Sequence, residues 1–143
     1  MKNLIPVNVA VTGILVIVSL TIVFHLLVMG GLISPAIVWG GNITSESHLW
    51  LMESVSIFIN LLMLLFVLAY AGVLKVKLPT LVFKVGFWAM FVLFALNTLG
   101  NLAAKHALET YIFTPLTFLL ALCCFRIAAY EFAKPNIAGG REA

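Results

Sequence analysis

The sequence predicts an all-α integral membrane protein with four transmembrane helices. First, 64% of its 143 residues are hydrophobic and only 9% are charged, too few polar residues to cover a soluble domain. Second, four apolar stretches each have about the 20 residues that a helix needs to cross a hydrocarbon layer ~30 Å thick. Third, the alternating pattern of membrane β-strands is absent from the sequence. Helices are therefore expected, because a helix satisfies its own backbone hydrogen bonds in lipid.

The predicted spans cover residues 7–29, 49–73, 81–104 and 111–130. The first contains no charged residue and one ionisable residue, His25, while each of the others contains a single charged residue. The first run is longer than that of a typical signal peptide and no small-residue cleavage site follows it, so we expect an uncleaved anchor. Short links favour an antiparallel up-down-up-down bundle, forming one membrane domain over residues 1–143.

Basic residues predict the orientation of this bundle. Of the eight Lys and Arg residues, seven fall on one predicted side, at Lys2, Lys75, Lys77, Lys84, Arg126, Lys134 and Arg141. Only Lys105 falls on the other. Cytoplasmic loops carry an excess of Lys and Arg, so both termini are expected in the cytoplasm, in a plasma or inner membrane. The net charge of +3 follows from this topology and requires no nucleic-acid partner.

The longest connection, residues 30–48, joins the first two spans. Its first half is apolar and contains two glycine pairs, at 30–31 and 40–41, and Trp39. Glycine pairs break helices and Trp favours the headgroup layer of a membrane. We therefore expect a partly ordered outer loop that folds over the mouth of the bundle.

Local signals predict where the later helices begin. Ser45 or Ser47 precedes the second span and can cap free backbone amides at its start. Thr114 and Pro115 fit the opening turn of the fourth span, where the missing N–H of proline costs little. Residues 109–113 would then follow an irregular path before that helix.

Polar residues concentrate in the predicted outer half of the bundle. Glu53, Ser56 and Asn60 lie within about 60° of one another at helical spacing. Asn97 and Asn101 are one turn apart in the next span. We predict that these two polar stripes face each other and line an outward-facing pocket.

The predicted ligand-binding residues are Glu53, Asn60, Asn97, Asn101, Lys105, His106, His25, Glu109 and Trp39. A carboxylate inside a membrane is costly, so Glu53 must be protonated or paired with a basic residue of this set. Alternatively, the asparagines only bridge helices, with Gly100 and Ala104 allowing close helix approach. His25, Lys105, His106 and Glu109 are also compatible with a solvated interface.

The sequence contains no HxxH, HExxH or paired-cysteine spacing, so we predict no metal and no cofactor. Cys123 and Cys124 are adjacent in the fourth span and point about 100° apart on a helix, so we expect two unpaired core residues. The sequence also lacks a GxSxG nucleophile motif.

Three functions remain open. The first is binding or transport of a small polar or cationic ligand, with Glu53 holding a cation or proton and with possible proton coupling. Four helices enclose little volume, so transport would require a homodimer in the lipid bilayer. The second is a structural or accessory membrane subunit without its own ligand. The third, less favoured, is a membrane enzyme that uses Glu53 with His106 or His25 on a lipid or quinone-like substrate.

Overall fold

The computed structural model describes residues 5–35, 39, 43–104 and 107–132. Its main elements are α1 (Val7–Met29), α2 (Glu46–Tyr70), α3 (Thr80–Leu102), the π-helix η3 (Glu109–Phe113) and α4 (Thr114–Tyr130). No strand occurs in these residues. Counting η3 with α4, four helices are long and apolar enough to cross a membrane. The prediction of an all-helical protein with four candidate spans is confirmed.

The helix boundaries confirm the local signals. Ser45 is the N-cap of α2, and its side chain accepts a hydrogen bond of 3.2 Å from the backbone N–H of His48. Pro115 lies in the first turn of α4. The π-helix covers residues 109–113, where the sequence predicted an irregular path. The chain therefore passes through this segment as a wider π-helical turn that leads directly into α4.

Glycine ends both α1 and α2. Gly31 (φ 74°) follows α1 and Gly72 (φ 75°) follows α2. In each case the glycine and the next residue donate backbone hydrogen bonds to the last turn of the helix, which is the Schellman arrangement. The first glycine pair thus ends a helix as predicted, whereas the pair at 40–41 lies outside the described residues.

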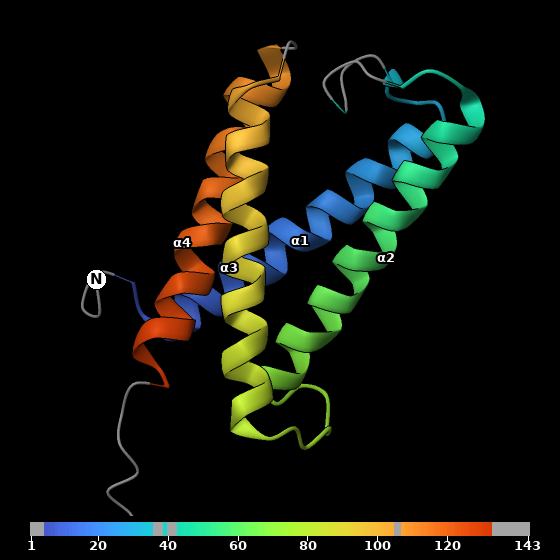
Figure 1. Ribbon diagram of the computed structural model, residues 1–143. Helices are drawn as coiled ribbons and strands as arrows, with labels where there is room; N and C mark the ends of the chain where they lie inside the picture. The colour runs from blue at the N-terminus through green and yellow to red at the C-terminus, as the bar shows by residue number, and fades with distance from the viewer. Residues whose placement is uncertain (1–4, 36–38, 40–42, 105–106, 133–143) are drawn as a thin grey trace, which may run out of the picture.

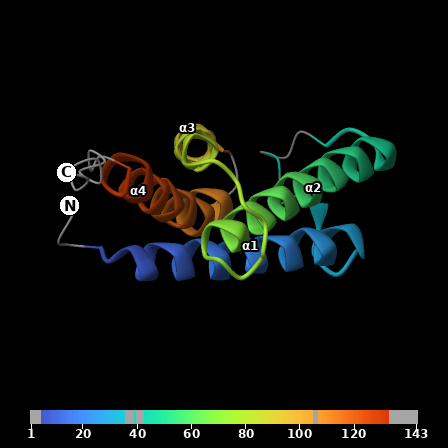
Figure 2. The same cartoon turned by 90° about the horizontal axis from the view of Figure 1, so that it is seen from below.

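The four helices form two pairs that cross each other. α1 lies beside α2, α3 lies beside α4, and α4 also packs against α1 (Figures 1 and 2). α2 and α3 meet near the link between them and diverge toward their other ends (Figure 1). We call the end where they diverge the Glu53 end and the end where they meet the Tyr70 end.

Aromatic side chains fill the Tyr70 end. The rings of Phe66 and Tyr70 from α2 pack against Phe87 of α3, with centroid distances of 5.4 and 4.8 Å. Phe83 and Phe132 extend this cluster. Such ring pairs contribute roughly 0.5–1.5 kcal/mol beyond their buried area, so this cluster holds the diverging helices together at one end.

The close contact between α2 and α3 depends on Gly86. A Cβ atom at this position would clash with Cζ of Phe66, whereas a Cβ at Gly100 would meet no atom of the described residues within 4 Å. The prediction that Gly100 allows close helix approach is therefore wrong for this chain. The small residue that permits the approach is Gly86, at the opposite end of α3.

The fourth helix supplies much of the core. Cys123 and Cys124 are buried and free, as predicted. Arg126, only 5% exposed, donates from Nε to the backbone carbonyl of Ile5 at 2.9 Å. This bond ties α4 to the segment that precedes α1.

Candidate functional site

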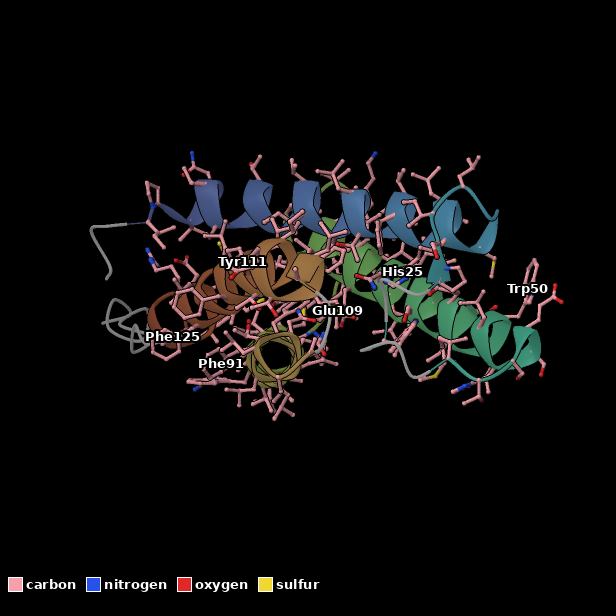
Figure 3. All side chains as sticks on the ribbon, turned by 90° about the horizontal axis from the view of Figure 1, so that it is seen from above. His25, Trp50, Phe91, Glu109, Tyr111 and Phe125 are labelled. Carbon is pink, nitrogen blue, oxygen red and sulfur yellow. The ribbon has the colours of Figure 1, made fainter. Side chains whose placement is uncertain are left out.

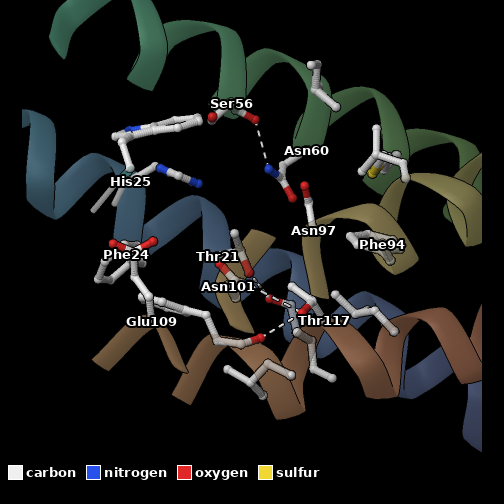
Figure 4. Close-up of a pocket in the computed structure, with 18 of the residues that line it drawn as sticks. Thr21, Phe24, His25, Ser56, Asn60, Phe94, Asn97, Asn101, Glu109 and Thr117 are labelled. Atoms are coloured by element: carbon white, nitrogen blue, oxygen red, sulfur yellow. Dashed lines mark hydrogen bonds between the residues drawn. The ribbon is translucent and has the colours of Figure 1, made fainter. Parts of the chain in front are cut away.

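A cavity of about 440 Å³ lies between the helices at the Glu53 end (Figure 4). Polar side chains from α1, α2, α3, η3 and α4 line it: Thr21, His25, Ser56, Asn60, Asn97, Asn101, Glu109 and Thr117. Much of the remaining wall is aliphatic or aromatic, including Phe24, Trp39 and Phe113. A mainly apolar wall with a few polar groups, at this volume, is typical of small-molecule sites.

Glu53 is fully buried behind this cavity. Its Oε2 lies 2.6 Å from Nδ1 of His25, and its Oε1 accepts a 2.9 Å hydrogen bond from Nε1 of Trp39. Its side chain is 0% exposed and does not line the cavity, whereas both partners do. Glu53 therefore positions His25 and Trp39, and its carboxylate does not reach the cavity as the sequence had suggested.

Trp39 adopts an unusual backbone conformation. Its φ is 58°, in the left-handed region that bulky residues rarely occupy without compensation. The hydrogen bond to Glu53 holds its indole in this position at the cavity wall. The outer loop thus reaches the cavity at Trp39, while residues 36–38 and 40–42 lie outside the described part.

His25 presents its second ring nitrogen to the cavity. Nδ1 is engaged by Glu53, and the labelled ring points into the open space in Figure 4. When Nδ1 donates to the carboxylate of Glu53, Nε2 of the neutral imidazole is a hydrogen-bond acceptor. In that tautomer, the Glu53–His25 pair provides an oriented acceptor.

Glu109 brings a second carboxylate to the same space. It belongs to η3, is only 7% exposed and lines the cavity. Figure 3, seen toward the Glu53 end, shows Glu109 and His25 in the space between the helices. Thr110 anchors η3 to α3 by donating a 3.2 Å hydrogen bond to the carbonyl of Asn101. π-Helical turns frequently occur at functional sites.

Two amide side chains face each other across the cavity. Asn60 donates from Nδ2 to the carbonyl of Ser56 in its own helix at 2.9 Å. Its amide and that of Asn97 on α3 point toward one another in Figure 4. Both residues line the cavity, and Asn97 is exposed. The two polar stripes therefore meet at one cavity, although Glu53 lies behind it.

Asn101 joins helices as well as lining the cavity. Its Nδ2 donates to Oγ1 of Thr117 at 3.4 Å, and Oγ1 of Thr98 lies 3.0 Å from the same oxygen. Thr117 in turn donates to the carbonyl of Phe113 at 2.8 Å. This network connects α3 with α4, as the helix-bridging interpretation of Asn101 expects.

The predicted site residues divide into three groups. Six line the cavity: His25, Trp39, Asn60, Asn97, Asn101 and Glu109. Glu53 lies behind two of these, and Lys105 and His106 lie outside the described residues. Ligand binding by any of them stays a prediction.

Sequence reasoning missed Phe24, Phe113 and Thr117 as lining residues. A signal was present in part, because Glu109, Phe113 and Thr117 follow one another at intervals of four, the spacing of one helix face. For Phe24, its place next to His25 in the sequence did not indicate which way its ring would point. Within the described part of the chain, no group of three His, Cys, Asp or Glu residues could hold a metal ion.

Comparison of the chain with protein-family models, curated proteins and solved structures finds no significant match. Function is therefore inferred from the cavity and its chemistry.

Proposed function

We propose that this protein binds a small organic cation in the cavity at the Glu53 end. The observation that carries the proposal is the convergence of polar side chains from four apolar helices and η3 on one space of about 440 Å³. Polar groups inside a membrane are costly and usually serve a function. Here they surround a volume suited to a small molecule.

The chemistry of the wall favours a cation with an apolar body. Glu109 supplies a carboxylate, and the rings of Phe24, Phe113 and Trp39 supply aromatic surface. Aromatic faces and carboxylates together recognise organic ammonium groups. His25 would accept a hydrogen bond from a ligand N–H through Nε2.

We further propose that the helices cross a plasma or inner membrane in up-down-up-down order, with both termini cytoplasmic and the Glu53 end outside. Support comes from the basic residues near the Tyr70 end, which include Lys75, Lys77 and Lys84. Aromatic packing fills that end. Transport through the protein would therefore require a homodimer or rearrangement, and proton coupling would involve the Glu53–His25 pair.

Binding is tested with benzyltrimethylammonium and purified protein in lipid nanodiscs. Titration calorimetry should detect saturable binding, and Glu109→Gln should weaken it at least tenfold, because truncating one partner of a buried charge pair costs 2–5 kcal/mol or more. Glu46→Gln, at an exposed acid in the first turn of α2, is the matched control and should bind normally. Absence of saturable binding, or unchanged binding by Glu109→Gln, would overturn the proposal.

A structural subunit is the second candidate function. The hydrogen bonds of Asn101 and Thr98 to Thr117 favour it, because they join α3 to α4 without any ligand. The enzyme hypothesis has a single supporting contact, the Glu53–His25 pair, in which a carboxylate orients an imidazole. Neither contact explains why a cavity adjoins these groups, so ligand binding is the preferred proposal.

A further inference from the structure

We infer that the ligand is a single-chain amphiphile, with a cationic head in the cavity and an alkyl tail on α3, that reaches the site from the lipid between α2 and α3. This inference rests on the proposed function and narrows its ligand class. The supporting features are a second hollow beside the cavity, the position of Asn97 and the divergence of two helices.

A groove of about 590 Å³ runs along α3 beside the cavity. Val85, Trp88, Ala89, Val92 and Leu96 line it, at spacings of three and four residues that place them on one helix face. Leu93 and Asn97 line both the groove and the cavity. The groove therefore begins where the cavity ends, and its walls are apolar except at this junction.

The groove has the length of a lipid tail. From Val85 to Asn97 there are twelve residue steps, which span about 18 Å at 1.5 Å per residue. Val85 lies five residues after the start of α3 and Asn97 five residues before its end, so the groove crosses the middle of this candidate span. An extended alkyl chain in the groove would therefore follow α3 across the middle of the hydrocarbon layer, while its head remained among the polar groups of the cavity.

Asn97 marks the junction of head and tail. It is an exposed amide five residues before the end of a candidate spanning helix, and a polar group inside a membrane without a partner is unfavourable. In the described part of the chain, no hydrogen bond is found for its side chain. A cationic head at the start of the groove would place its positive charge beside the oxygen of this amide, an interaction that the surrounding lipid tails cannot offer.

The helix arrangement supplies a lateral route. α2 and α3 are in contact where Gly86 admits the ring of Phe66, and they diverge toward the Glu53 end (Figure 1). Beyond that contact, side chains of both helices line the cavity, among them Asn60 on α2 and Asn97 on α3. On this inference, an amphiphile enters the cavity from the bilayer on the side where α2 and α3 diverge, without crossing the outer loop.

The test compares alkyltrimethylammonium ions with butyl, octyl and dodecyl chains in lipid nanodiscs, with partitioning into protein-free nanodiscs subtracted. Affinity for the wild type should rise at least tenfold from butyl to dodecyl. Val92→Trp should abolish this rise by filling the groove. Val16→Trp is the matched control, because Val16 on α1 is 52% exposed and Val92 is 51% exposed, and it should retain the rise.

Benzyltrimethylammonium separates this inference from the proposed function. It has no alkyl tail, so its affinity should be the same for the wild type and for Val92→Trp. Normal binding of this ion without any dependence on chain length would overturn the inference and leave the proposed function standing. A loss of oligomeric state in Val92→Trp, measured by native mass spectrometry, would instead identify the groove as a contact between copies and would also overturn it.

Discussion

The two ends of this molecule use the same helices in opposite ways. At the Tyr70 end, Phe66, Tyr70 and Phe87 fill the space between α2 and α3 with rings. At the Glu53 end, those helices diverge and polar side chains surround an open cavity. In lipid, packing rather than hydrophobic burial drives helix association. The difference teaches that close packing at one end allows the other end to stay open.

Polar contacts also differ between the ends. The Glu53 end contains a fully buried carboxylate whose two oxygens contact His25 and Trp39. Near the Tyr70 end, the buried Arg126 donates to a backbone carbonyl before α1. The first set of contacts holds cavity-lining side chains in place, whereas the second ties the chain together. The two ends should therefore respond differently to substitution.

The largest expected effect comes from Glu53→Leu. Removing the fully buried carboxylate leaves the partly buried side chains of His25 and Trp39 without their shared partner, and breaking a buried pair in this way costs about 3–5 kcal/mol. The melting temperature in nanodiscs should fall clearly. Glu46→Leu, at an exposed acid of the same helix, should change stability by less than about 1 kcal/mol. Equal effects of the two substitutions would show that the Glu53 pair does not organise this end.

A smaller effect is expected from Gly86→Ala at the Tyr70 end. The new methyl group would clash with Cζ of Phe66, so the ring must move, at a cost of about 1–3 kcal/mol. The better helix propensity of alanine returns up to about 1 kcal/mol. The methyl group of Gly100→Ala would meet no atom within 4 Å in the described part of the chain, so this substitution should be neutral or stabilising in the same thermal assay. A stabilised Gly86→Ala protein would contradict the close approach.

The helices were predictable because their causes are local. The lengths of the apolar stretches predicted four candidate spans. The helix ends follow from the local preferences of single residues: Ser45 caps a start, Gly31 follows an end and Pro115 lies in a first turn. The crossing of the two helix pairs was not predictable in this way. The crossing depends on which small residue contacts an aromatic ring of another helix. The sequence alone suggested Gly100, whereas the close contact, with Phe66, occurs at Gly86.

The candidate site was predictable in composition more than in arrangement. Helical spacing grouped Asn60, Asn97 and Asn101 near one space, and the structure places all three on the cavity wall. The expected contact between Glu53 and a basic residue is also found, with His25. The sequence could not indicate that the carboxylate lies behind the cavity and also accepts a hydrogen bond from Trp39. That choice depends on the loop reaching back to α2, a long-range contact with no periodic signal.

The meeting of α2 and α3 polar stripes at one cavity is tested most directly by cross-linking. In a variant with Cys123→Ala and Cys124→Ala, a short thiol-specific cross-linker should join Asn60→Cys to Asn97→Cys within one chain. It should not join Asn60→Cys to Leu99→Cys, because Leu99 is 63% exposed and lines neither the cavity nor the groove. Equal cross-linking of both pairs, or of neither, would contradict a shared cavity between these helices.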